Sequence, residues 1–180
     1  MSNMDPRLQL INGDLMSFCH FLNSLSNPPK LVPSDFEDAL ISLSYRLLYL
    51  HPLGYGAALD PVSNAYHLGS VALLWTIMFE SGRLHRSRYS LLANRIQNAV
   101  DLLIAVGSDT SLLVLWLLLL GGISVMRHDD KSWLYERVRS CIGVPGLENW
   151  QDARKLLANL PWIHLIHDKP AEKLWHEAVT

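Results

Sequence analysis

The chain has 180 residues, of which 49% are hydrophobic and only 18% charged, and its formal net charge is −2 at pH 7. Binding to a nucleic-acid backbone relies on clustered Lys and Arg, so this balance argues against nucleic acid as a partner. A chain of this length is expected to form one domain with a sizeable core. Six tryptophans and six tyrosines exceed what a small core usually needs. The surplus indicates a partner surface, a wide interior or a pocket for an apolar ligand.

The two cysteines and the N-terminus bear on the cellular compartment. Cys19 and Cys141 lie far apart in the sequence, and the first residues, MSNMDPRLQL, lack the basic start and apolar stretch of a signal peptide. Both features predict free thiols in a reducing compartment, which is the cytoplasm for an enzyme.

Three helices are expected in the first half of the chain. Apolar residues recur at steps of three and four over residues 7–25, which predicts an amphipathic helix. The proline-rich segment 26–35 indicates a loop, and a helix over 35–50 follows it. Asp60 and Pro61 supply an N-cap and a first-turn proline for a third helix that ends at Gly82.

The second half contains the most apolar run, LLVLWLLLLGGISVM at 112–126, after a helix over 88–106 that Gly107 closes. As a helix these fifteen residues rise only about 22 Å, short of the roughly 30 Å hydrocarbon core of a bilayer. Charged residues follow at 127–131, so the run predicts a core helix buried on all sides and no membrane span. The double glycine Gly121-Gly122 within it indicates close helix packing.

Helices over 131–142 and 149–160 follow, the second capped by Asn149, and a last helix is expected after Pro170. The segment PWIHLIHDKP before it resembles a helix end preceding a loop. No strand-type alternation is sustained. The sequence therefore predicts an all-α fold, a single-domain bundle of about seven helices over residues 1–180.

The usual motifs of cofactor chemistry are missing. The chain has no G-x-x-x-x-G-K, G-x-G-x-x-G or G-x-S-x-G pattern and no Cys-x-x-Cys pair. His164 and His167, with the adjacent Asp168, come nearest to a metal site, but a third ligand has to come from elsewhere. Structural hydrogen bonding or capping is the favoured interpretation of this pair. We expect no cofactor and no metal.

Polar residues within apolar helices are the strongest candidates for a site. His67 follows the same helical stripe as Val71 and Leu74, where an unpaired imidazole costs about 1–3 kcal/mol. Such a residue is more often a hydrogen-bonded core group than a site. Several of them converging on one cavity are, however, what a small-molecule pocket requires. The basic segment around Arg86 similarly indicates either a solvated linker or a corner that binds a carboxylate.

Four segments of the second half suggest a family. LWLLLLGGISV, DDKSW, ENWQDARKLLANLPWI and HDKPAEKLW, in this order, resemble the C-terminal part of the fungal-specific transcription factor domain. YRLLYLHPLG, DPVSNAYHLGS and ALLWTIMFESGR are similar to the preceding part, so the resemblance covers residues 36–177. This chain lacks the zinc binuclear cluster that usually precedes the domain. Small stand-alone relatives resemble proteins of fungal natural-product gene clusters that steer cyclisations, including Diels–Alder cycloadditions and cationic rearrangements.

The resemblance implies a cofactor-free cyclase or isomerase of fungal secondary metabolism, in the lyase or isomerase class. It would bind a hydrophobic terpenoid- or polyketide-like intermediate and accelerate an intramolecular cycloaddition or rearrangement. Such a step needs an apolar pocket that folds the substrate and donors aimed at a carbonyl. The alternative is a non-catalytic module that regulates transcription, in the nucleus, or binds a ligand or partner. Either interpretation is compatible with a homodimer.

The pocket is expected between three parts of the chain: the helix of Tyr45 and Tyr49, the helix of Tyr66 and Trp75, and the tryptophan-rich C-terminal half. The expected catalytic donors are His67, Tyr45 and Tyr66. The expected substrate-binding residues are Arg46, Tyr49, Trp75, Arg86 and Trp116.

Overall fold

The structure is a computed structural model that describes residues 4–24, 33–54, 59–80, 89–107 and 110–180. Within these ranges the chain forms eight α-helices and one 3-10 helix, and no strand. The prediction of an all-α fold is confirmed, with one helix more than the expected seven. Arg86 lies outside the described residues. The helices are α1 (Pro6–Ser24), α2 (Pro33–Leu50), α3 (Pro61–Glu80), α4 (Ser90–Val106), α5 (Ser111–Ser124), α6 (Lys131–Cys141), α7 (Trp150–Leu157) and α8 (His164–Val179), with the 3-10 helix η2 (His128–Asp130) before α6.

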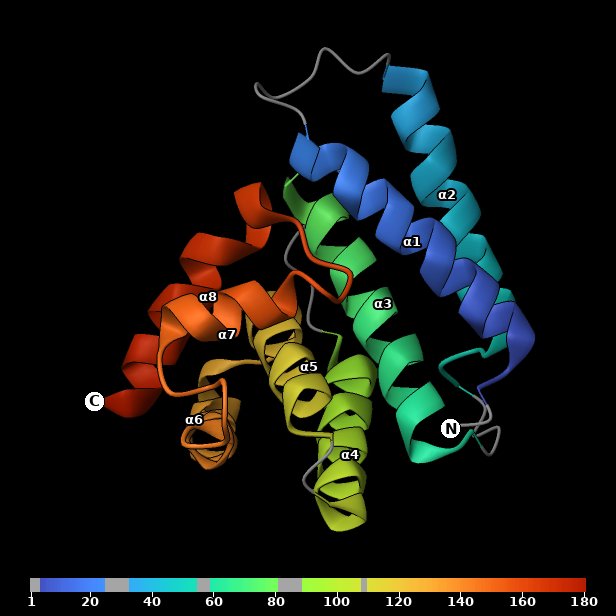
Figure 1. Ribbon diagram of the computed structural model, residues 1–180. Coiled ribbons are helices and arrows are strands. Elements are labelled where there is room, and N and C mark those ends of the chain that lie inside the picture. The colour runs from blue at the N-terminus through green and yellow to red at the C-terminus, as the bar shows by residue number, and fades with distance from the viewer. Residues whose placement is uncertain (1–3, 25–32, 55–58, 81–88, 108–109) are drawn as a thin grey trace.

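Two helices, α3 and α5, organise the packing. The α3 helix contacts α1 and α2 as well as α4, α5 and α8, whereas α5 also contacts α4, α6, α7 and α8. Figure 1 shows α1 and α2 beside each other on one flank of α3, with α6, α7 and α8 gathered on the side of α5.

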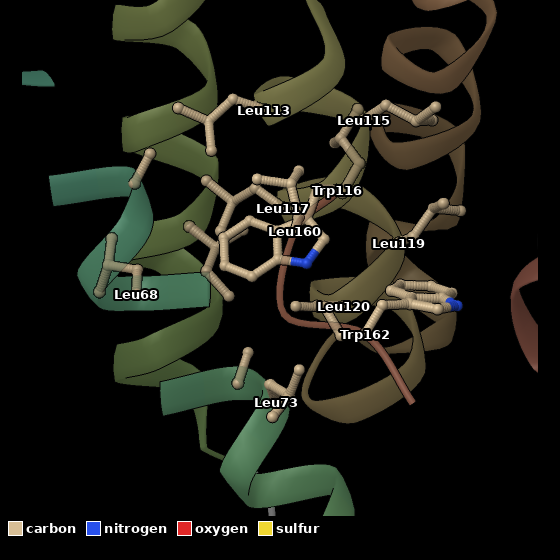
Figure 2. Close-up of a cluster of buried hydrophobic side chains, with 14 of the residues drawn as sticks. Leu68, Leu73, Leu113, Leu115, Trp116, Leu117, Leu119, Leu120, Leu160 and Trp162 are labelled. Atoms are coloured by element: carbon tan, nitrogen blue, oxygen red, sulfur yellow. The ribbon is translucent and has the colours of Figure 1, made fainter. Parts of the chain in front are cut away.

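The α5 helix is the apolar run of the sequence, and it is buried along its length. Every residue from 113 to 120 is buried, with side chains at most 8% exposed. Figure 2 shows leucines and Trp116 of α5 packed with Leu68 and Leu73 of α3. The prediction of a helix buried on all sides is confirmed. No helix among the described residues is both long and apolar enough to cross a bilayer.

Three of the expected helix ends are confirmed by their local geometry. The Asp60 carboxylate accepts hydrogen bonds from the backbone N–H groups of Val62 (3.1 Å) and Ser63 (3.0 Å) at the start of α3. Asn149 accepts from the N–H of Asp152 at the start of α7. Gly107 ends α4 with a φ of 125°, which glycine adopts without strain.

The expected start of the last helix is wrong. The α8 helix begins at His164, and Pro170 lies inside it rather than before it. Proline in a helix interior removes one backbone hydrogen bond. The part of α8 before Pro170 is also anchored from outside the helix, because the Asp168 carboxylate accepts hydrogen bonds from Trp162 (2.8 Å) and Arg154 (2.7 Å). The segment PWIHLIHDKP is therefore a linker followed by about the first two turns of α8.

The double glycine lies at the end of α5, where three helices meet. A Cβ atom added at Gly122 would stand 2.4 Å from Cδ1 of Leu174 in α8 and 2.8 Å from Cδ2 of Leu134 in α6. Both distances are far shorter than real contacts, so the glycine is what permits this approach. The prediction of close helix packing at this position is confirmed.

Candidate functional site

His67 is enclosed between α2 and α3. Its side chain is 1% exposed, and its Nε2 lies 3.1 Å from the backbone oxygen of Leu47. Because a carbonyl can only accept, Nε2 carries the hydrogen and donates it. Burial lowers the pKa of His67 to about 4, which keeps the imidazole neutral at pH 7. His67 is therefore a hydrogen-bonded core group.

Two tyrosines of α2 face solvent. Tyr45 and Tyr49 are 67% and 76% exposed, and their rings stack with centroids 5.7 Å apart. The guanidinium of Arg46 forms an ion pair with Asp14 of α1 at 2.6 Å. With Ile41 and Leu48 the two tyrosines form an exposed apolar stripe. The structure does not bring these residues together with His67.

Tyr66 and Trp116 lie next to each other in the core. Their ring centroids are 6.0 Å apart, and burial raises the pKa of Tyr66. Trp116 is completely buried, and its Nε1–H donates to the backbone oxygen of Pro161 at 2.9 Å. Its indole hydrogen is thus used inside the protein, and Figure 2 shows the ring surrounded by leucines.

Trp75 lines a small apolar cavity between α2 and α3, near the place where the sequence analysis expects a pocket. Tyr89 closes one side of it, with ring centroids 5.1 Å apart. The described residues enclose a volume of about 110 Å³. Ligand pockets usually measure roughly 300–1,000 Å³, so this space fits a few water molecules or a small fragment, not a polycyclic intermediate.

His164 and His167 are engaged with protein groups. His167 is fully buried between Thr76, 2.7 Å from its Nε2, and the backbone N–H of Ile163, 3.0 Å from its Nδ1. Nδ1 of His164 lies 3.1 Å from the Asp168 carboxylate. Burial alone would raise the pKa of Asp168, but hydrogen bonds from Trp162, Arg154 and His164 outweigh it and lower the pKa. Among the described residues, no three His, Cys, Asp or Glu side chains gather as metal ligands do.

A larger hollow among the described residues lies elsewhere, where α5 ends and the chain turns into α6. We call it the α5–α6–α8 groove; its volume is about 470 Å³. Val125, Leu134 and Leu174 form a buried apolar wall. Gly122 contributes to the shape because it lets Leu134 and Leu174 close over the end of α5.

Charged groups line the opposite part of the groove. The Glu177 carboxylate accepts a short hydrogen bond from the Tyr135 hydroxyl, and it lies 3.4 Å from Nζ of Lys131 and 3.8 Å from Nζ of Lys173. The hydrogen bond from Tyr135 is the main reason why the pKa of Glu177 is lowered. The neighbouring Tyr135 and Glu177 raise the pKa of Lys131. Arg127 and His128 complete this part of the lining.

Sequence reasoning missed the groove residues. One signal was present: Lys131 with Tyr135, and Lys173 with Glu177, stand four positions apart and so share a face of their helices. Which face of α6 meets which face of α8 depends on tertiary packing, so the spacing alone does not reveal the site.

Comparisons with known proteins identify no relative. No protein-family model, curated protein or solved structure matches the chain. The resemblance to the fungal transcription factor domain therefore stays a prediction that rests on the quoted segments.

Proposed function

We propose that the chain is a small-molecule-binding module and that the α5–α6–α8 groove is its site. The observation that carries the proposal is the groove itself: about 470 Å³, within the usual range for ligand pockets, with an apolar wall facing a few polar groups. Helices α5, α6 and α8 form most of its walls and pack on one another in the core, and the turn at 125–127 completes the lining.

The surroundings of the expected donors support binding over catalysis. A cyclase needs its substrate folded in an enclosing pocket, with donors aimed at the position where charge develops. Of the expected catalytic donors, His67 donates to Leu47, Tyr45 points to solvent, and Tyr66 packs against Trp116. The binding module is accordingly the alternative that we propose, with a hydrophobic small molecule as its partner.

The experiment introduces a bulky side chain into the groove and measures how this changes the binding of a neutral fluorescent probe, N-phenyl-1-naphthylamine. Ser124 is half-buried at the end of α5 and lines the groove, so Ser124→Phe places a ring in the ligand's space. We expect the wild-type protein to bind the probe at one site and Ser124→Phe to bind it at least about tenfold more weakly, a loss of ~1.4 kcal/mol.

Ser140→Phe is the matched control. Ser140 also bonds a carbonyl of its own helix but is exposed on α6 outside the groove, and its replacement should leave binding unchanged. Circular dichroism checks that both variants are folded. Equal probe affinity in folded Ser124→Phe and wild type would contradict the proposal.

A further inference from the structure

We infer that the ligand of the α5–α6–α8 groove is an amphipathic monocarboxylate, an apolar tail that ends in a single carboxylate. This inference rests on the proposed function, because it names the class of ligand for the same site. The inference is based on the lining of the groove, in which cationic side chains lie on one part and apolar side chains on another.

The groove is cationic although the whole chain is acidic. Arg127, Lys131 and Lys173 line it, and Glu177 is the one carboxylate among the lining residues of the described chain. The complete sequence has a net charge of −2. A surplus of positive charge that runs against the average of the molecule attracts an anionic group.

Glu177 does not cancel this surplus. Two lysines share its carboxylate, at 3.4 Å and 3.8 Å, while the Tyr135 hydroxyl donates to it as well. No described carboxylate forms an ion pair with Arg127. One further anion beside Glu177 would therefore find the two ammonium groups, which carry several N–H donors each, whereas the single Tyr135 hydroxyl hydrogen is already donated to Glu177.

The apolar wall determines the rest of the ligand. Val125, Leu134 and Leu174 are at most 9% exposed as side chains of the core, and the half-buried Ile123 and Met126 extend the wall toward solvent. Inorganic anions gain nothing from such a surface, whereas a hydrocarbon tail gains affinity with every methylene that it buries. A carboxylate head with an apolar tail uses both parts of the lining.

The test compares three ligands that share one tail: octanoate, octanol and octylamine, titrated by calorimetry at about pH 7. We expect octanoate to bind most tightly and octylamine most weakly. Raising the salt concentration should weaken octanoate binding, because salt screens the attraction between the carboxylate and the partly exposed lysines of the groove. Binding of octanol, which carries no charge, should stay unchanged.

Two variants change the head-group preference in opposite directions. Lys131→Gln with Lys173→Gln should bind octanoate about tenfold more weakly, while octanol binding stays within about twofold. Glu177→Gln removes the competing anion and should bind octanoate about two- to fivefold more tightly. Lys155→Gln with Lys169→Gln makes the same charge change at exposed positions outside the groove and should bind octanoate like the wild type.

The outcomes separate this inference from the proposed function. If octanol or octylamine binds as tightly as octanoate, and Ser124→Phe abolishes that binding, the groove is a ligand site but the carboxylate class is wrong. Weaker octanoate binding by folded Glu177→Gln would also overturn the carboxylate class. If none of the three ligands binds the wild-type protein although the neutral probe does, the carboxylate class is wrong; if the neutral probe does not bind either, the proposed function itself fails.

Discussion

Two buried histidines, His67 and His167, are neutral and hydrogen-bonded in the core. The N–H of Ile163 donates to Nδ1 of His167, so Nε2 must carry the hydrogen, which it donates to the Thr76 hydroxyl. Thr76 in turn donates to the backbone oxygen of Leu73 at 2.6 Å. Burial lowers the pKa of His167 to about 3 and that of His67 to about 4. Protonation of either ring would place an unpaired charge in the core.

The protein should therefore lose stability in mild acid. The unfolded chain binds protons at these histidines below about pH 6.5, whereas the folded protein binds them only near pH 3 to 4. The free energy of unfolding should fall by up to ~1.4 kcal/mol per pH unit for each histidine. Urea unfolding at about pH 7 and about pH 5 measures this slope. Carboxylates with lowered pKa, such as Asp168, act in the same direction only below about pH 4.

His67→Gln tests the assignment. The glutamine amide can still donate to Leu47 but does not titrate, so the slope between pH 7 and pH 5 should decrease by up to ~1.4 kcal/mol per pH unit. His176→Gln, at an exposed position of α8, should leave the slope unchanged. A wild-type slope in folded His67→Gln would contradict the explanation.

At the scale of elements, the contact between α3 and α5 depends on one glycine. A Cβ added at Gly69 would lie 2.1 Å from Cζ3 of Trp116. The indole cannot move aside easily, because it is fully buried and its Nε1 is bonded to Pro161. The two central helices thus approach closely only because position 69 has no side chain.

Gly69→Ala should destabilise the protein by about 1–3 kcal/mol through this overpacking. Gly13 is the matched control, since it is also mid-helix but has no atom within 4 Å of an added Cβ. Gly13→Ala should stabilise the protein by about 0.5–1 kcal/mol, because alanine restricts the unfolded chain. Urea unfolding of both variants measures the difference. A Gly69→Ala protein as stable as Gly13→Ala would show that the core accommodates the methyl group.

At the scale of the molecule, the linker between α7 and α8 joins distant parts of the chain. Its backbone accepts hydrogen bonds from Asn23 of α1, at Trp162 (2.8 Å), and from Trp116 of α5, at Pro161 (2.9 Å). Asn23 also accepts from the N–H of His164, at 2.9 Å. The two ends of the sequence are therefore held together at the first turn of α8.

Asn23→Ala should lower the free energy of unfolding by about 1–2 kcal/mol, since it removes two hydrogen bonds that span the molecule. Faster hydrogen exchange of the His164 amide should accompany this loss. Asn98→Ala, at an exposed position of α4, should change the stability by less than about 0.5 kcal/mol. Unchanged stability and unchanged exchange at His164 in Asn23→Ala would contradict this role.

The sequence by itself determined the fold class and most helices. Local patterns suffice for this: apolar periodicity, the caps at Asp60 and Asn149, and an apolar run too short for a membrane depend only on neighbouring residues. The sequence places the last helix too late, because Pro170 resembles a helix start locally. The hydrogen bonds that Asp168 accepts from α7 and from the linker are tertiary contacts, which a local pattern does not reveal.

Only the tertiary structure decided the site. Periodicity correctly put His67 on a buried stripe, but it does not tell a hydrogen-bonded core group from a ligand-facing one; the position of Leu47 does. The tyrosines of α2 face solvent because α1 and α3 cover the other faces of that helix. The α5–α6–α8 groove joins residues about 40 to 50 positions apart, such as Tyr135 and Glu177. Their meeting depends on which helix faces pack together, and that choice is made by the whole core rather than by any local pattern.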